Sequence, residues 1–317
     1  MLITPIIRCL KAQLEGASVH LLTKTNMKSV LEPNPYLDKI ITIDDDFDIS
    51  LKALKEEHYD FIVDLHNNLR SRRFRYALGV QGAAFPKLNI EKWLLVNFKV
   101  NRLPKKHIVD RYFEAVKGLN IHNDAQGLDF FIPSTLKSPA AKLPLFYQEG
   151  YIGIVVGGQH TTKKLPVDRL KKLCEKIKHP IVLLGGPEDR YNATKISEGL
   201  GSRVLNACGS YSLQESALLV RDARLIITHD TGLMHIAAAF QKPIITLWGN
   251  TVSDFGMYPY LTDKSSYTGF EQNMPCRPCS KIGFDACPKG HFGCMRNQPL
   301  EEIAAKAEEY WINSAKK

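Results

Sequence analysis

The 317-residue sequence predicts an α/β protein of two domains, each built on a parallel sheet that is covered by helices. Short apolar runs alternate with amphipathic segments along most of the chain, which is the pattern of strand–helix–strand units. A stretch rich in Pro, Ser and Lys at residues 134–148 divides the pattern into two series and predicts a linker. The length also suits two domains of about 150 residues each.

The first series begins with a helix instead of a strand. Its helices are expected at residues 3–14, 48–57, 67–78 and 106–118, and its strands at 19–22, 39–43 and 60–64. A domain of this kind normally begins with a strand. We therefore expect the first sheet to lack one strand and to have a rearranged or poorly ordered N-terminal edge.

The second series is more regular. Its strands are expected at residues 151–156, 181–184, 203–205, 224–228 and 243–248, and its helices at 166–177, 188–199 and 212–222. Residues 299–317 predict a final amphipathic helix. Parallel strands end at one edge of the sheet, and that edge is where such sheets bind ligands.

Composition narrows the class of protein. The net charge of +9 favours an acidic partner, and nucleic acid, anionic lipid and a phosphorylated small molecule all satisfy it. Seven cysteines, an odd number, indicate a reducing compartment. No apolar run reaches the ~18 residues of a transmembrane helix, and the first residues lack the pattern of a secretory signal. We expect a cytoplasmic protein.

The most informative segment is the turn between the strands at 224–228 and 243–248. Asp230 and Thr231 occupy the position of a helix N-cap, and Gly232 allows a ligand to approach the backbone. His235 follows Thr231 by about one helical turn and is expected on the same side. Free N–H groups and the positive end of the helix dipole favour phosphate. An ordinary capped helix is the alternative for this segment taken alone.

Two further loops follow strands of the same predicted sheet. Lys163 lies in a flexible basic loop and can meet a phosphate as a point charge. Gly185 allows close approach, and Glu188 is placed to accept hydrogen bonds from ribose hydroxyls. The three loops together predict a pocket for a nucleotide diphosphate. The motifs of P-loop ATPases and of dinucleotide-dependent dehydrogenases are missing.

A second candidate surface follows the strand at 60–64. Arg70, Arg72, Arg73 and Arg75 are expected on one helix and predict a seat for an acceptor rich in phosphates and carboxylates, with a solvated helix face as the alternative. Asp64 and His66 come from the same strand end and are candidate general bases.

The cysteines gather near the C-terminus. Cys276, Cys279, Cys287 and Cys294 lie within about 20 residues, with His291 nearby, which suits tetrahedral zinc. Their spacing departs from the usual paired arrangement. We expect free or partly buried thiols, with structural zinc as the alternative.

These motifs together resemble glycosyltransferase family nine, the heptosyltransferases of lipopolysaccharide core assembly. The resemblance covers nearly the whole chain. It rests on Asp230-Thr-Gly-Leu-Met-His235 followed by Ala237-Ala-Ala239, Gly185-Gly-Pro-Glu-Asp189, Lys163-Lys-Leu-Pro166, Asp64-Leu-His-Asn-Asn-Leu-Arg-Ser71 and Thr4-Pro-Ile-Ile-Arg-Cys-Leu-Lys11.

The resemblance implies a GT-B fold of two Rossmann-like domains. Residues 1–145 would bind a lipid-linked acceptor, residues 150–296 would bind ADP-heptose or a related nucleotide sugar, and a helix at 297–317 would cross back to the first domain. The implied transfer inverts the anomeric carbon without a metal or cofactor, at the cytoplasmic membrane face. Nucleic acid is not an expected partner.

The same resemblance implies individual roles. Thr231, Gly232 and His235 would contact the diphosphate, and Asp230 would cap and orient the turn. Lys163 would offset the charge of the leaving group. Glu188 would hold the ribose.

The sequence departs from the family at its start. The family's first strand and the loop with its catalytic Asp would precede Met1, so we expect that the chain as given lacks this base, either because the gene start was placed at an internal Met or because the protein is truly shortened. Loss of a general base costs about 10²–10⁴-fold in rate. Asp64 or His66 would then be substitutes. A nucleotide-sugar-binding homologue with impaired turnover is the alternative function.

Overall fold

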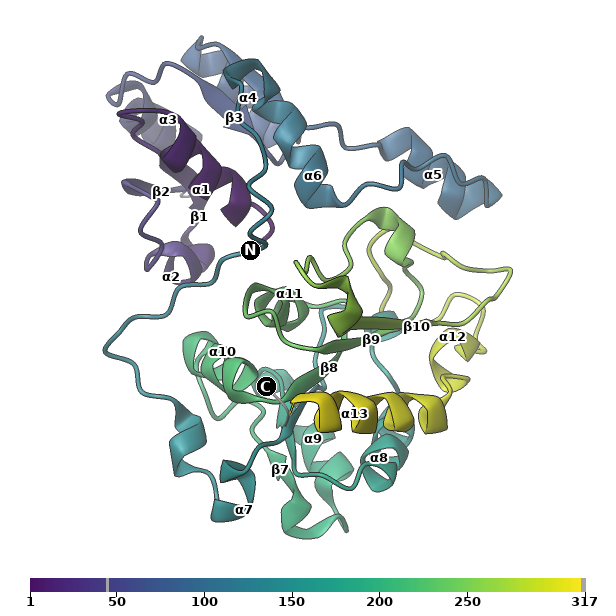
Figure 1. Ribbon diagram of the computed structural model, residues 1–317. Coiled ribbons are helices and arrows are strands. Elements are labelled where there is room, and N and C mark those ends of the chain that lie inside the picture. The colour runs from purple at the N-terminus through teal and green to yellow at the C-terminus, as the bar shows by residue number, and fades with distance from the viewer. Residues whose placement is uncertain (44–45, 315–317) are drawn as a thin grey trace. The chain divides into compact units, whose positions relative to one another are not determined.

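The computed structural model describes residues 1–43 and 46–314, which divide into two compact units (Figure 1). The N-terminal unit comprises residues 2–88 and 106–133. The C-terminal unit comprises Met1, residues 89–105 and residues 134–317. The division at residue 134 falls at the start of the predicted linker, whereas the return of residues 89–105 to the C-terminal unit was not expected.

The N-terminal unit alternates short strands with helices. Its elements are α1 (Thr4–Gln13), β1 (His20–Lys24), α2 (Lys28–Leu31), β2 (Lys39–Ile43), α3 (Phe47–Lys55), β3 (Ile62–Asp64), α4 (Leu69–Leu78), β4 (Gly82–Ala84) and α6 (Ile108–Tyr112). Its strands form two separate parallel pairs, β1 with β2 and β3 with β4. Among the described residues of this unit no strand joins the two pairs.

A buried ion pair fixes α1 in the N-terminal unit. The Arg8 guanidinium donates to both carboxylate oxygens of Asp124 at 2.8 Å and to the Gly127 carbonyl at 2.9 Å. It also pairs with Asp129. A buried charge needs such partners because its removal from water is costly. The arrangement therefore ties the first helix to the segment 124–129.

The C-terminal unit contains one parallel sheet of six strands in the order β10-β9-β8-β5-β6-β7. Its strands are β5 (Ile152–Val155), β6 (Ile181–Leu184), β7 (Val204–Asn206), β8 (Leu225–His229), β9 (Ile244–Trp248) and β10 (Tyr267–Glu271). Its helices are α5 (Asn89–Phe98), α7 (Leu145–Gln148), α8 (Val167–Lys176), α9 (Arg190–Ser197), α10 (Leu213–Asp222), α11 (Gly232–Ala239), α12 (Gly293–Arg296) and α13 (Leu300–Ser314).

Both faces of this sheet are covered. Every residue of β5, β6, β8 and β9 is buried. Alternate strand residues such as Ile154, Leu183 and Ile227 share one core with α8, α9 and α13. The residues between them are equally buried, so α10 and α11 must cover the other face. Strands buried on both faces read as continuous apolar runs, which explains why the sequence predicts them well.

The last helix was expected to cross back to the first domain, and this stays a prediction. In the structure α13 belongs to the C-terminal unit and packs against α8, β8 and β9 (Figure 1). Leu300, Ile303, Ala307 and Tyr310 line its buried face at helical spacing. This apolar stripe matches the core of the six-stranded sheet. None of the described helices is long and apolar enough to span a bilayer.

Candidate functional site

The centre of the six-stranded sheet is a topological switch point. From β5 the chain proceeds to β6 and β7 on one side of the sheet, and β8, β9 and β10 lie on the other. The loops that follow β5 and β8 therefore diverge, which leaves room for a ligand at the carboxyl ends of these two strands. Lys163 lies in the first of these loops, and Asp230 directly follows β8.

Lys163 and Asp230 form an ion pair at this point. The Lys163 Nζ lies 2.6 Å from the Asp230 Oδ2, and both side chains are largely buried. The Thr251 hydroxyl donates to the same carboxylate oxygen at 3.4 Å. An ammonium group has three protons, so Lys163 can donate to Asp230 and still donate to phosphate oxygens. Asp230 therefore positions a cation at the switch point.

The helix start beside this pair is open. The Met234 N–H donates to the Thr231 Oγ1 at 3.4 Å, so Thr231 is the N-cap of α11. A Cβ added to Gly232, the first residue of α11, would meet no atom within 4 Å. Exposed N–H groups at a helix start favour an anion. Thr231, rather than Asp230, caps the helix, which corrects the expected role of Asp230.

His235 occupies the second turn of α11 and is buried. The sequence analysis expected it to face the same anion as Thr231. The His235 side chain is covered by other residues of the unit. Contact between His235 and a ligand stays a prediction.

A neutral histidine supports the floor of the site. His229, the last residue of β8, is completely buried, and its Nε2 accepts the Leu165 N–H at 2.9 Å. Burial lowers the pKa of His229 to about 4. The imidazole is therefore neutral near pH 7 and retains the lone pair that this hydrogen bond requires. It fixes the loop that carries Lys163, and the sequence analysis did not identify it.

The position of the Asp189 side chain explains why residues 157 and 185 are glycines. Its buried carboxylate accepts the Gly186 N–H at 3.1 Å and pairs with Lys164 at 3.3 Å. A Cβ on Gly157 would lie 2.1 Å from the Asp189 Oδ2, and one on Gly185 would lie 2.9 Å from it. Gly185 was expected to admit a ligand, but the adjacent space holds Asp189. Glycine is required there for internal packing.

Glu188 precedes Asp189, and its side chain is exposed beside this turn. Its contact with a ribose stays a prediction.

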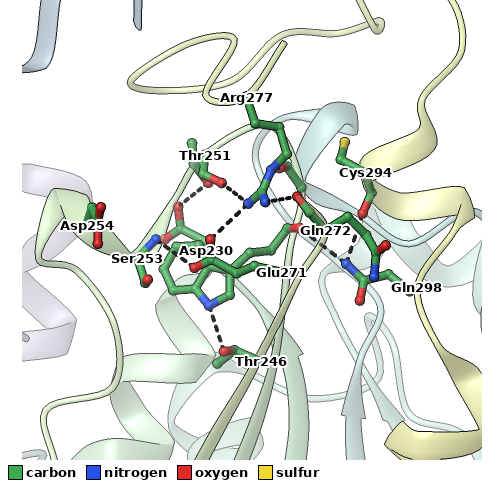
Figure 2. A network of polar contacts seen from close by, with 12 residues as sticks. Asp230, Thr246, Thr251, Ser253, Asp254, Glu271, Gln272, Arg277, Cys294 and Gln298 are labelled. Atoms are coloured by element: carbon green, nitrogen blue, oxygen red, sulfur yellow. Dashed lines mark hydrogen bonds and ion pairs between the residues drawn. The ribbon is translucent and has the colours of Figure 1, made fainter. Parts of the chain in front are cut away.

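Arg277 joins the ends of β9 and β10 in the polar network that also contains Asp230 (Figure 2). Its Nε donates to the Gly249 carbonyl at 2.6 Å, and its Nη2 donates to the Thr251 carbonyl at 2.8 Å and to the Glu271 carboxylate at 3.2 Å. Because Thr251 also contacts Asp230, Arg277 supports the ion pair from outside. Arg277 was not predicted from the sequence, since its main partners are backbone groups of distant loops.

Asp64 of the N-terminal unit is committed to the backbone. Its carboxylate accepts the His66 N–H at 3.0 Å, the Asn67 N–H at 2.6 Å and the Ser71 hydroxyl at 2.9 Å. It is also buried. This geometry organises the start of α4 and disfavours Asp64 as a general base, which must reach a substrate proton.

His66 differs from Asp64 because its side chain is exposed. Partial burial and the nearby cations Lys87, Arg70 and Lys24 lower the pKa of His66. Its imidazole is therefore neutral near pH 7, which is the form that accepts a proton.

A basic cavity of about 750 Å³ lies in the N-terminal unit. It is lined by Lys24, Thr25, Asn26, Ile43, Phe47, Leu69, Arg70, Arg73 and Phe74. The Arg73 guanidinium lies 3.8 Å from the centre of the Phe47 ring. Arg72 instead donates to the Asn67 Oδ1 at 2.9 Å, and Arg75 lies over Tyr76. Two of the four expected arginines therefore line this cavity.

The cysteine cluster consists of free thiols in the structure. The Cys276 Sγ lies 3.8 Å from the His291 Nε2. Burial, followed by the proximity of Cys276, raises the pKa of Cys279 to about 11. Among the described residues no three His, Cys, Asp or Glu side chains are arranged to hold a metal ion. Structural zinc at Cys276, Cys279, Cys287 and Cys294 stays an untested alternative.

A parallel sheet with its switch point between β5 and β8, and a capped helix start beside that point, has the architecture of a Rossmann-like domain. The chain belongs to glycosyltransferase family 9 (heptosyltransferase), whose model matches residues 50–283.

Individual relatives agree with this membership. Lipooligosaccharide heptosyltransferase 2 of Haemophilus influenzae is 25% identical over 233 residues, which are 68% of this chain and 66% of that protein. The chain thus spans just under two thirds of this relative.

Solved structures show the fold. The glycosyl transferase family 9 structure from Veillonella parvula matches with a TM-score of 0.75 and 20% identity, covering 98% of this chain and 93% of that one. The E. coli ADP-heptose lps heptosyltransferase II matches with a TM-score of 0.69 and 17% identity, covering 99% and 95%. The protein has the GT-B fold of such heptosyltransferases, as expected from the sequence.

Proposed function

We propose that this protein transfers heptose from ADP-heptose, or a closely related nucleotide sugar, to a lipopolysaccharide core acceptor with inversion. The observation that carries the proposal is the Lys163–Asp230 ion pair, 2.6 Å long, at the switch point of the C-terminal sheet. Family membership supports the sugar class, because a relative of the same fold is named for ADP-heptose.

The donor diphosphate would lie against the start of α11. The free N–H groups at Gly232 and the Lys163 ammonium both direct positive charge toward this space. Negative charge develops on the diphosphate as its bond to the anomeric carbon breaks. Groups that are already fixed in place stabilise that charge without reorganising, so they lower the barrier. Asp230, Thr251 and His229 provide this fixation.

The acceptor would occupy the basic cavity of the N-terminal unit. Lys24, Arg70 and Arg73 supply cations for phosphate or carboxylate groups of a core saccharide. His66 is exposed and neutral near pH 7, and would take the proton of the acceptor hydroxyl. The lipid part of such an acceptor places the reaction at the cytoplasmic face of the membrane.

Product formation tests the proposal. Purified protein is incubated with ADP-heptose and a heptose-deficient lipopolysaccharide core, and the glycosylated product is measured by mass spectrometry. We expect Lys163→Ala to reduce kcat by about 10²–10³-fold, the usual effect of removing one charge-stabilising donor. Lys172→Ala, on the exposed side of α8, is the matched control and should retain activity. Equal activity of the two variants contradicts the assigned role of Lys163.

The second candidate function is donor binding without turnover. The burial of Asp64 favours it, because this carboxylate accepts hydrogen bonds from backbone N–H groups and is not available as a general base. ADP would then raise the thermal unfolding temperature, since a ligand of the native state stabilises it. No product would form. Product formation by the wild-type protein excludes this candidate.

A further inference from the structure

The helix α5 turns its apolar side toward solvent. Ile90, Trp93 and Phe98 are exposed to 72%, 54% and 62%. Spacings of three and eight residues place these side chains on one face of the helix. Leu95, which points in another direction, is buried. A helix on the surface of a globular domain normally shows the reverse arrangement, with its polar side outward.

The C-terminal end of α5 is attached firmly to the C-terminal unit. The Lys99 Nζ donates to the Pro278 carbonyl at 2.7 Å and to the Cys276 carbonyl at 3.1 Å. Asn101 donates to the Asp254 carboxylate. The rings of Trp93 and Phe98 contact each other edge to face, with centroids 5.2 Å apart. The apolar side is therefore presented on a supported helix.

The segment around α5 is strongly basic. Within the C-terminal unit, residues 89–105 contain four basic side chains and one acidic side chain, Glu91. The basic residues are Lys92, Lys99, Arg102 and Lys105. An interface between proteins is usually depleted of lysine at its core. Exposed Trp, Phe and Ile beside lysines and arginines are instead typical of helices that lie on an anionic bilayer.

We propose that α5 docks the protein on an anionic lipid surface, with Ile90, Trp93 and Phe98 inserted at the level of the headgroups. The apolar side chains supply burial, and the basic segment supplies attraction to the negative lipids. The biological reason for this contact rests on the proposed function, because a lipid-linked acceptor stays in the membrane. The contact itself is independent of catalysis.

Vesicle sedimentation tests the contact. The full-length protein is mixed with vesicles of phosphatidylethanolamine and phosphatidylglycerol, and in parallel with phosphatidylcholine alone. We expect binding to the anionic vesicles, weak binding to the neutral ones, and loss of binding at high salt because screening weakens the charge attraction. Equal binding to both kinds of vesicle, or binding to neither, overturns the proposal.

Matched variants locate the surface. Trp93→Ser with Phe98→Ser should reduce anionic-vesicle binding at least about ten-fold. Leu145→Ser with Phe146→Ser is the control, because these side chains are also exposed, to 88% and 53%, but lie on α7. Arg102→Glu with Lys105→Glu should reduce binding without altering the apolar side. Unchanged binding of the Trp93/Phe98 variant, or an equal loss in the control, overturns the proposal.

Tryptophan fluorescence gives a second measurement. Trp93 is exposed, whereas Trp248 is buried and Trp311 is partly covered. Anionic vesicles should shift the emission of the wild-type protein to shorter wavelength, and Trp93→Phe should abolish the shift. A shift that persists in Trp93→Phe contradicts insertion of α5.

Two further measurements separate this proposal from its alternatives. Sedimentation without lipid shows whether α5 instead joins two copies of the chain. The proposal is overturned if the wild-type protein is a dimer that does not bind vesicles, and if Trp93→Ser with Phe98→Ser dissociates this dimer. Activity on a lipid-free core fragment should be unchanged in that variant. Vesicle binding with no product formation would leave the docking surface intact and refute the proposed function alone.

Discussion

The sheets of the two units differ in how completely they are buried. Every residue of β5, β6, β8 and β9 in the C-terminal unit is buried, whereas β1, β2 and β4 of the N-terminal unit have no buried residue. The proposed donor site lies on the ends of the buried strands. The proposed acceptor cavity is lined largely by helix and loop side chains. Charge stabilisation needs groups that are held in place, and side chains at the ends of buried strands meet this need.

The largest expected effect tests this difference in burial directly. Leu183→Ala in β6 removes a completely buried side chain and should lower the free energy of unfolding by about 2–5 kcal/mol. Ile41→Ala in β2 removes a partly exposed side chain and should cost about 1 kcal/mol, because less apolar area is lost. Urea denaturation measures both variants. Equal losses would show that the two units do not differ in this respect.

The pH dependence of stability sharpens the comparison. The pKa of buried His229 is lowered from 6.5 to about 4. Between these pH values the unfolded chain binds more protons at His229 than the folded chain does. The free energy of unfolding should therefore keep its full value above pH 6.5 and decrease as the pH falls toward 4. The loss at pH 4 should be on the order of 3 kcal/mol.

His229→Asn should largely remove this pH dependence, as measured by urea denaturation at several pH values. His66→Asn is the control in the N-terminal unit, because the His66 side chain is exposed whereas His229 is buried. A steeper effect of His66→Asn would contradict the assignment.

A smaller effect should come from Gly232→Ala. An added Cβ meets no atom within 4 Å, so the unfolding temperature of the ligand-free protein should change little. The same methyl group would occupy the space in front of the helix start and should weaken ADP binding by about ten-fold. Calorimetry with ADP measures this affinity. Gly157→Ala is the contrasting variant, because its Cβ would strike Asp189 and should reduce folding stability. Unchanged ADP affinity in Gly232→Ala contradicts the proposed donor position.

The smallest effect is expected in the acceptor cavity. Arg70→Ala with Arg73→Ala should raise the KM for the acceptor several-fold and leave ADP affinity unchanged, since the two partly solvated contacts together contribute only about 1 kcal/mol. Arg75→Ala is the control, because Arg75 does not line the cavity. Steady-state kinetics with varied acceptor measure this effect. An equal rise in the control contradicts the cavity as the acceptor site.

The strands that the sequence predicts best are those buried on both faces. The bounds expected for residues 181–184 match β6, and those for 243–248 nearly match β9, because a continuous apolar run needs little other information. The strands β4 and β10 were not predicted from the sequence. The Gly-Ala-Ala segment at 82–84 and the Tyr-Thr-Gly-Phe-Glu segment at 267–271 lack such runs. The helix α5, whose apolar side faces away from its own domain, was not predicted either.

The candidate site was predictable where a motif lies within one loop. Lys163, Thr231 and Gly232 come together in the C-terminal unit as the strand order requires. The supports of these residues were not predictable, because they depend on contacts between distant segments. Asp189 packs against Gly157, and Arg277 bonds to carbonyl groups far from it in the sequence. Such contacts leave no local pattern.

Residues 89–105 belong to the C-terminal unit, although the segments before and after them belong to the N-terminal unit. This arrangement affects any attempt to separate the two units. After its first residue the chain passes between them at 88–89, 105–106 and 133–134. Cleavage at residue 133 would leave α5 on the N-terminal fragment, without the carbonyls that hold Lys99. The two pieces would therefore be poor independent folding units, and co-expression or circular permutation would be needed to study either alone.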